Sequence, residues 1–438
     1  MSLLVHKVSM RDFGAIGDGK TINTVAFQKA IDSCHGASSL INVEAGKYVL
    51  GTVFLKSNLE FHLCEGAELL GSLNLNEYST ENTGAIEAPA FDKCLIFAEN
   101  LENIKITGPG IINGRGASEN FPEKNLQGKI CDRPMLMRFV NCKEIYFTQV
   151  TLKDAASWCV HMVDCTNIVA EKMFISSHVN TNNDGFDLDG CENVLIEHCS
   201  IDSGDDSICP KSTTQRVCNN YVVKNCKISS GTAAFKLGTS SLGGFRNMHF
   251  LDCEIFNCTM GVIKLLLVDG GIMEDIHFSR LNMQNVAGPI FIRLGNRGRS
   301  YNCPTEQVYD ANRHEGHASV GSIRGITLKD IKATVTSPNF YYNGIMITGI
   351  PHKSIENIEL ENIEISFPGG FPMKDFPQQV PEDESRYPEQ FFFGNLPSWG
   401  AYLRHINNIS FKNVRLSTRC LDERSRIIVE DVEVFSET

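Results

Sequence analysis

The chain has 438 residues, of which 42% are hydrophobic and 21% are charged, and its formal net charge is −12 at neutral pH. This composition is typical of a globular protein with enough apolar side chains for a large core. The acidic balance argues against nucleic acid and against an anionic membrane surface as partners. No stretch approaches the roughly 18 consecutive apolar residues that a membrane span needs.

Residues 11–34 predict a strand, a Gly-rich turn and an amphipathic helix, with Asn23 or Thr24 at the helix N-terminus. The buried face of this helix is expected to contain Phe27, Ala30 and Ile31. Such a helix would cover the open end of a strand stack, within an N-terminal cap at about residues 8–40. The Gly-Asp-Gly sequence in the turn is no phosphate loop, because it lacks the Lys-Ser/Thr ending and the βαβ context.

A pattern of apolar residues then recurs along the chain. Each copy has apolar or small residues at its start and two, five and seven positions later, often with Asn or Asp before the third of these positions. The copies start at Ile168, Val194, Tyr221, Met248, Ile276, Ile326, Ile358 and Ile409, with a truncated copy at Ile427. The first spacings are 26, 27, 27 and 28 residues. This period indicates a solenoid, and the β-branched residues with Gly and Asn punctuation indicate strands.

One strand-built coil per repeat predicts an all-β fold: a single-stranded right-handed parallel β-helix of about ten coils with an N-terminal capping helix. The alternatives are a β-propeller, whose blades repeat at about 40 residues, and a β-sandwich. Because the repeat is continuous, we expect one domain over residues 1–438. Loop insertions are expected at about residues 115–134, 296–321 and 366–404. Aromatic side chains in the last insertion can either stack on sugar rings or pack locally.

Two acidic clusters interrupt the apolar pattern. Asp184 lies in Asn-Asn-Asp-Gly, and Asp205 and Asp206 lie in Ser-Gly-Asp-Asp-Ser. Asp184 and Asp205 are 21 residues apart, close to one period, and coils stack about 4.8 Å apart. We therefore expect three crowded carboxyl groups, at least one of which titrates at a raised pH. The alternatives are a calcium site and a set of Asp residues that cap turns.

The 16 cysteines are informative about the packing of the core and about the compartment in which the protein is found. Cys199, Cys226 and Cys253 are 27 residues apart, which predicts a ladder of small, inward-facing side chains. A zinc site is the alternative, but no Cys or His pair has ligand spacing. Many free thiols suit a reducing compartment, and the first residues show no signal-peptide pattern. We expect a cytoplasmic protein, the alternative being a secreted or periplasmic one whose signal has been removed.

Several segments together resemble the family 28 glycoside hydrolases, the polygalacturonase and rhamnogalacturonase family of the pectin lyase-like superfamily. The matching segments are residues 12–31, Gly108–Gly114, Arg133-Pro134, Trp158 with His161, Asn182–Gly185 and Gly204–Asp206. The resemblance covers nearly the whole chain. It implies a parallel β-helix that hydrolyses glycosidic bonds with inversion of configuration.

On the matching residues, the resemblance implies that Asp205 is the general acid and that Asp184 and Asp206 activate water on the opposite face of the sugar. Inversion needs an acid and a base about 6.5–9.5 Å apart, with room for a water molecule. Crowding by two other carboxylates would keep the acid protonated near neutral pH.

The chain departs from the family at two sugar-binding segments. Ala233 replaces the His of a Gly-His-Gly segment, and Lys264 is the only base where the family has Arg-Ile-Lys. These losses argue against plain polygalacturonate as the substrate. Lys236, Lys264 and Arg293 are 28 and 29 residues apart, which predicts a substrate-binding basic stripe, the alternative being a solvated charged face. The remaining expected substrate-binding residues are Asn182 and His161.

We therefore expect an inverting, exo-acting hydrolase of an acidic pectic carbohydrate, of the galacturonan or rhamnogalacturonan type. The 366–404 insertion would wall off one end of the groove, and residues 115–134 would wall another side. The alternatives are a pectate-lyase-like β-eliminase and a non-catalytic carbohydrate-binding β-helix. We expect no cofactor, no metal, no nucleic-acid partner and no membrane, and no oligomeric state follows from the sequence.

Overall fold

A computed structural model describes residues 6–35, 38–79, 92–299, 319–337, 339, 343–371 and 379–438. The chain divides into two compact units, residues 1–205 and residues 206–438. Most of the expected insertion at 296–321 lies outside the described residues. The prediction of one domain over the whole chain stays a prediction.

The first unit consists mainly of short strands. Its helices are η1 (Met10–Phe13), α1 (Thr24–Ser33) and η2 (Leu75–Glu77). Its strands are β1 (His6–Ser9), β2 (Asp18–Ile22), β3 (Ser39–Val43), β4 (Gly46–Leu50), β5 (Val53–Phe54), β6 (Leu59–Leu63), β7 (Ala67–Gly71), β8 (Cys94–Glu99), β9 (Glu102–Thr107), β10 (Ile111–Asn113), β11 (Met135–Val140), β12 (Lys143–Thr148), β13 (Thr151–Lys153), β14 (Val160–Val163), β15 (Thr166–Glu171), β16 (Phe174–Ser177), β17 (Phe186–Asp189), β18 (Glu192–Glu197) and β19 (Ser200–Ser203).

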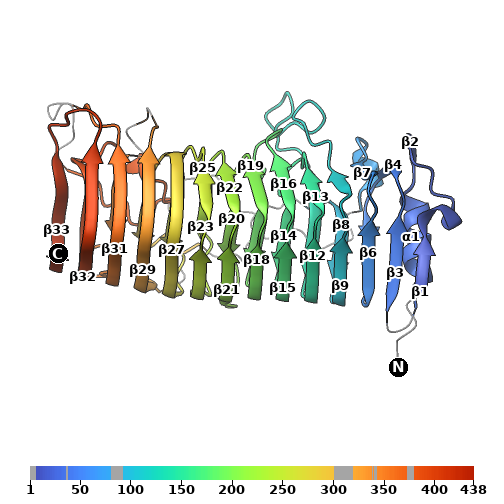
Figure 1. Cartoon of the computed structure of the whole chain (residues 1–438), viewed down its shortest axis with the longest axis horizontal. Coiled ribbons are helices and arrows are strands. Elements are labelled where there is room, and N and C mark those ends of the chain that lie inside the picture. The colour runs from blue at the N-terminus through green and yellow to red at the C-terminus, as the bar shows by residue number, and fades with distance from the viewer. Residues whose placement is uncertain are drawn as a thin grey trace. The chain divides into compact units, whose positions relative to one another are not determined.

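These strands form three parallel ladders, one on each side of the coil. The first runs β1–β3–β6–β9–β12–β15–β18, and its middle strands lie side by side in Figure 1. The second runs β2–β4–β7–β10–β13–β16–β19. The third runs β5–β8–β11–β14–β17, and Asp184 lies two residues before β17, its last strand in this unit. The all-β parallel fold is therefore as predicted.

The second unit, described by itself, has the same architecture with longer strands. Its strands are β20 (Ile208–Lys211), β21 (Cys218–Lys224), β22 (Lys227–Ser230), β23 (Ala233–Leu237), β24 (Phe245–Leu251), β25 (Glu254–Phe256), β26 (Gly261–Leu267), β27 (Ile272–Val286), β28 (Ile290–Leu294), β29 (Ser322–Val335), β30 (Ile345–Thr348), β31 (Glu356–Phe367), β32 (Ser398–Thr418) and β33 (Ser425–Glu437). A 3-10 helix, η5 (Gln390–Phe393), precedes β32.

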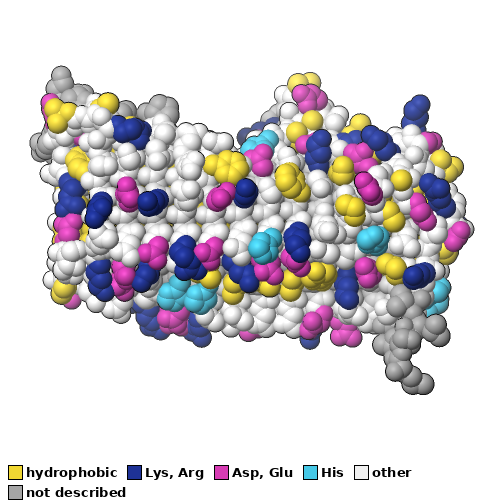
Figure 2. All heavy atoms as spheres, viewed as in Figure 1, with side chains coloured by type: hydrophobic (Ala, Val, Ile, Leu, Met, Phe, Trp, Pro, Cys, Tyr) yellow, Lys and Arg dark blue, Asp and Glu magenta, His cyan; other side chains and the backbone are white. Residues whose placement is uncertain are grey.

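Residues at equivalent repeat positions pair in register in this unit, as predicted. Tyr221 pairs with Met248, which pairs with Ile276, and the row continues through Ile326. Core side chains therefore stack on their own kind, as the Phe250 and Phe278 rings do at 4.4 Å between centroids. On the outer side, Figure 2 shows Lys and Arg interspersed with Asp and Glu over β27, β29 and β31. The truncated copy placed at Ile427 is wrong, because Ile409 pairs with Phe435 and Ile427 pairs with Ala401.

Left-handed residues explain the Asn and Asp of the repeat. The residue before the third apolar position has a φ of 53–55° in five successive copies, at Lys172, His198, Asn225, Asp252 and Arg280. This conformation turns the chain sharply between two ladders, and Asn and Asp tolerate it better than most side chains do. The cysteines that follow this bend, Cys199, Cys226 and Cys253, are all buried, which confirms their inward orientation.

Helix α1 supplies the predicted N-terminal cap. Phe27, Ala30 and Ile31 are fully buried, and the Phe27 ring lies 5.4 Å from that of Tyr48 and 6.3 Å from that of Phe61. Asn23 is the N-cap residue, but its side chain makes no capping hydrogen bond. Among the described residues, none of the helices is both long and apolar enough to cross a membrane.

Replacing Phe27 with Ala should lower the free energy of unfolding by about 3–5 kcal/mol, because the buried ring leaves a cavity under the cap. Urea unfolding measures this change. Val25→Ala is the matched control in the same helix, since Val25 is 66% exposed. Equal effects of the two substitutions would show that α1 does not close the core.

Candidate active site

The turn that carries Asp184 joins β16 to β17 and is built around a buried amide. The Asn183 side chain is fully buried, and its Nδ2 donates to the carbonyl oxygens of Ala155 at 2.9 Å and Ser157 at 3.1 Å. Its Oδ1 accepts from the backbone N–H of Asn180 at 2.8 Å. Asp184 follows at once and is itself buried, two residues before β17. The position of the Asp184 backbone is thus set by its neighbour's amide.

The Arg133 side chain also stabilises this turn, through hydrogen bonds. Its Nη1 donates to the carbonyl oxygen of Thr181 at 2.6 Å, and its Nη2 donates to Oδ1 of Asn182 at 2.7 Å. Asn182 has a φ of 55°, so the turn passes through a left-handed residue at this point. The amide oxygen of Asn182 is engaged by Arg133, and its expected contact with substrate stays a prediction.

Residues 115–134 lie against this turn. Asn180 Nδ2 donates to the carbonyl oxygens of Gly116 at 2.9 Å and Phe121 at 2.7 Å. A Cβ atom at Gly116 would lie 2.1 Å from the carbonyl carbon of Ala155, so only glycine permits this approach. The loop therefore lies beside the Asp184 turn, and its expected role as a wall of the groove stays a prediction.

His161 is buried in β14, in a polar row of the third ladder. It pairs in register with Arg138 on β11 and with Asp187 on β17, and all three are buried. The ring of Trp158 meets the His161 ring edge-on, with centroids 4.9 Å apart. Burial lowers the pKa of Arg138. Substrate contact by His161 stays a prediction, and Arg138 and Asp187 are polar neighbours that the sequence interpretation did not identify.

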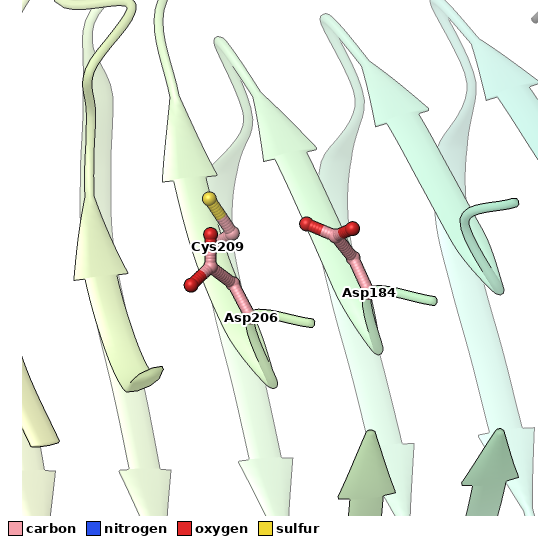
Figure 3. A group of neighbouring side chains, drawn as sticks. All are labelled: Asp184, Asp206 and Cys209. Atoms are coloured by element: carbon pink, nitrogen blue, oxygen red, sulfur yellow. The ribbon is translucent and has the colours of Figure 1, made fainter. Parts of the chain in front are cut away.

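The second acidic cluster spans the boundary of the two units. Asp205 closes the first unit, partly exposed, and its backbone N–H donates to the carbonyl oxygen of Asn183 at 3.3 Å. Asp206 opens the second unit, buried, two residues before β20. Figure 3 shows that Asp184 and Asp206 each leave the chain just ahead of a strand. The two residues thus hold equivalent positions relative to β17 and β20.

Within the second unit, Asp206 forms a buried ion pair. Its Oδ2 accepts from Lys236 Nζ at 2.6 Å, and its Oδ1 accepts from Thr232 Oγ1 at 2.7 Å. Lys236 Nζ also lies 3.2 Å from the Tyr387 hydroxyl oxygen. The side chains of Asp206 and Lys236 are only 4% and 11% exposed. Tyr387 comes from the 366–404 insertion, which therefore reaches the acidic cluster.

The pKa directions follow from this pairing. Burial raises the pKa of Asp206, but the charges of Lys236 and Lys264 and the hydrogen bonds from Lys236 and Thr232 outweigh it and hold the pKa below its usual 3.8. Burial lowers the pKa of Lys236, and the charge of Asp206 more than offsets this, so the pKa is raised. Desolvation raises the pKa of Tyr387 to about 12. Asp206 is an ionised carboxylate at neutral pH.

The predicted stacking of the basic stripe is confirmed for two residues and wrong for the third, and the substrate-binding role of the stripe stays a prediction. Lys236 pairs in register with Lys264, on adjacent coils. Lys264, however, pairs with Phe291, and Arg293 pairs with Leu266. The coils here repeat at 27 residues (264 to 291), so a spacing of 29 places Arg293 two residues out of line. Arg293 is buried, and burial with the nearby charge of Arg404 lowers its pKa to about 10.

Lys264 is paired with the insertion. Its Nζ donates to Oε2 of Glu389 at 2.6 Å, and the two side chains are 1% and 9% exposed. Tyr387 and Glu389 are thus the site residues that sequence interpretation missed. The sequence did predict the long insertion in which both residues lie. The positions of residues in the insertion do not follow the repeat, so the repeat could not predict their contacts.

Residues 379–396 cover the outward side of β26, β28, β30 and β32, which we call the site face. Arg293 Nη2 donates to the carbonyl oxygen of Glu382, and Arg404 Nη1 donates to that of Val380 at 2.8 Å. The apolar cluster on this face consists of Leu266, Phe291, Met346, Val380, Phe393, Leu396 and Tyr402. For Phe393 and Tyr402, local packing is therefore the role observed. The insertion ends at residue 397, because β32 already begins at Ser398.

Taken alone, neither unit has, among its described residues, three His, Cys, Asp or Glu side chains close enough together to share a metal ion. Within the second unit, two buried carboxylates are paired with protein cations, Asp206 with Lys236 and Glu389 with Lys264.

Comparison with known proteins gives one family model and several similar proteins. The model of the glycosyl hydrolases family 28 matches residues 41–380. A protein of Vitis vinifera named "Probable polygalacturonase" is 29% identical over 387 residues, which is 83% of this chain and 75% of that protein. The "Exo-poly-alpha-D-galacturonosidase" of Dickeya chrysanthemi is 26% identical over 334 residues, covering 64% of this chain and 55% of that protein.

The solved structures that are similar show the fold. The family 28 exopolygalacturonase of Yersinia enterocolitica superposes with a TM-score of 0.75 at 20% identity, covering 99% of this chain and 79% of that one. A hyperthermoactive exopolygalacturonase of Thermotoga maritima gives a TM-score of 0.68 at 24% identity, covering 82% and 87%. The right-handed parallel β-helix is thus the fold of this chain.

Replacing Lys236 with Met should reverse the contribution of Asp206 to the pH dependence of stability. In the wild type, the lowered pKa means that this carboxylate stabilises the fold above its usual pKa of 3.8, and the gain is lost as pH falls through the folded-state value. Without Lys236, burial should raise the pKa, so the carboxylate destabilises the fold at neutral pH by about 3–5 kcal/mol. Stability should then increase as pH falls.

Urea unfolding between about pH 2 and 7 measures both slopes, because the wild-type contribution is lost only as pH falls below the usual pKa of 3.8. Lys227→Met is the control, because Lys227 is a surface residue, 65% exposed, that pairs with Glu254 at 3.4 Å. Parallel pH profiles of wild type and Lys236→Met would contradict the assignment of a buried, functionally ionised Asp206.

Proposed function

We propose, from the premise that this chain belongs to family 28 of the glycosyl hydrolases, that it releases sugar units from the end of a pectic chain with inversion of configuration. The chain is a glycoside hydrolase, and its relatives include polygalacturonases and an exo-acting galacturonosidase. Pectic carbohydrate is the substrate class that membership of this family implies. The proposal concerns which glycosidic bond is cleaved, the terminal one, and the inversion of configuration at the anomeric carbon.

The observation that carries the proposal is the ionised, buried Asp206. A base that activates water must be unprotonated at the working pH, and Lys236 and Thr232 hold Asp206 in that state. Asp184 stands at the equivalent position, two residues before its strand, and 22 residues earlier (206 minus 184). We assign these two carboxylates to water activation, on the basis of the repeat spacing and the family.

Asp205 is assigned as the general acid. It is the most exposed of the three carboxyl groups, which suits a group that must reach the glycosidic oxygen. In the proposed step, Asp205 gives its proton to that oxygen as the bond from the anomeric carbon breaks. The oxygen of the activated water attacks the same carbon from the opposite face, and the water's proton passes to the Asp184 and Asp206 pair. One displacement inverts the configuration.

Exo action is supported by the covered site face. The insertion places Tyr387 on Lys236 and Glu389 on Lys264, and Arg293 and Arg404 hold its backbone. A polymer that ran along the second unit past Asp206 would have to displace this buried segment. A chain end needs no such passage, so terminal cleavage is the action that the covered face favours.

Asp205→Asn should lower turnover of a pectic oligosaccharide by about a hundredfold or more, because Asn cannot donate the proton to an unactivated leaving group. Reducing-end release measures the rate, and Asp202→Asn is the control on the neighbouring strand, where Asp202 is 48% exposed. Proton NMR of the first wild-type product should show the inverted anomer. Wild-type turnover by Asp205→Asn would refute the assignment of Asp205 as the acid. A product with retained configuration would refute single displacement. An unsaturated product absorbing near 235 nm would indicate a lyase.

A further inference from the structure

The two lysines of the site face are charge-compensated by the protein itself. Lys236 and Lys264 lie in register on β23 and β26, and both side chains point away from the coil interior. The orientation follows from Phe235, the residue before Lys236, whose ring packs inside at 5.0 Å from Phe250. Lys236 pairs with Asp206, and Lys264 pairs with Glu389, each at 2.6 Å. Two buried cations thus face two buried carboxylates.

The Glu389 carboxylate is the ion-pair partner of Lys264, so an acidic group that binds Lys264 must displace it or add to it. Lys264 is only 1% exposed, and Glu389 approaches it from the insertion, the side from which a ligand on the site face would come. A uronate arriving here would bring a third negative charge to two lysines that are already paired. Burying an uncompensated charge is costly, whereas hydroxyl groups can donate hydrogen bonds to a carboxylate.

We propose that the terminal sugar recognised beside Asp206 is a neutral unit, and that Glu389 makes the site select it. The proposal rests on the proposed exo hydrolysis and refines its substrate class to a pectic chain that ends in a neutral hexose or deoxyhexose. Glu389 is a specificity-determining residue here. The hydroxyl groups of a neutral sugar donate to its carboxylate, and the same carboxylate repels a uronate.

The test uses two trisaccharides that differ in one group. One is trigalacturonate, and the other has galactose in place of the galacturonate at the non-reducing end, so that a carboxylate becomes a hydroxymethyl group. Binding is measured by calorimetry in the Asp205→Asn background, and kcat/KM is measured in the catalytically intact protein. The galactose-ended sugar should bind about tenfold or more tightly, because it adds no charge to the paired lysines.

Three further variants test whether the charges of Glu389 and Lys264, and not the shapes of their side chains, set the sugar preference. Glu389→Gln leaves Lys264 uncompensated and should reverse the preference toward the galacturonate-ended sugar. The double variant Lys264→Met with Glu389→Gln removes both charges and should lose that reversal. Glu384→Gln is the matched control, since Glu384 is a partly exposed carboxylate of the same insertion, and it should leave the preference unchanged.

The outcomes distinguish the two proposals. Tighter binding of the galacturonate-ended sugar by the protein with Glu389 intact would overturn the neutral-site inference and leave hydrolysis standing. Preferential binding of the galactose-ended sugar without turnover by the intact protein would overturn the proposed exo hydrolysis alone. Binding of neither trisaccharide would overturn both. A Glu389→Gln protein with wild-type preference would also overturn the inference, and circular dichroism shows whether each variant is folded.

Discussion

The in-register pairing of parallel strands is the constraint on which the rest of the structure depends. Backbone hydrogen bonds between coils fix which residue faces which, at a spacing of about 4.8 Å. Apolar residues then stack into continuous rows, as Met248 and Ile276 do, and polar residues stack as well, as Lys236 and Lys264 do. The constraint brings functional groups together without a dedicated loop, and it also requires that every charge in a row has a partner.

The insertion at residues 379–396 supplies partners for the second unit. Lys264 would lose its ion-pair partner on the site face without Glu389, and Arg293 and Arg404 gain acceptors from the insertion's backbone carbonyls. Buried charges are tolerated when they are paired and hydrogen-bonded. Under the proposed function, the same contacts that satisfy these cations also close the face to a long polymer. Stability of the coil and restriction of the substrate therefore have one structural cause.

The sequence was informative where the repeat governs the structure. Its period predicted the strands, the ladders, the inward cysteines and the Lys236–Lys264 pairing, and the apolar face of residues 24–33 predicted the capping helix. It failed for Arg293 and Ile427, because the coils differ in length: Arg293 lies two residues after the partner of Lys264, and Ile427 lies eight residues before the partner of Ile409. It could not predict Glu389 on Lys264, since an irregular insertion has no period and its contact spans 125 residues of sequence.

The central claim is that the covered site face restricts the enzyme to chain ends. Viscosity and reducing ends, followed together during digestion of a long pectic polymer, test it most directly. The account predicts that reducing ends accumulate while the viscosity falls only slowly, because each event removes one terminal unit. A steep early fall in viscosity with few new ends would show cleavage within the chain and would contradict the closed face.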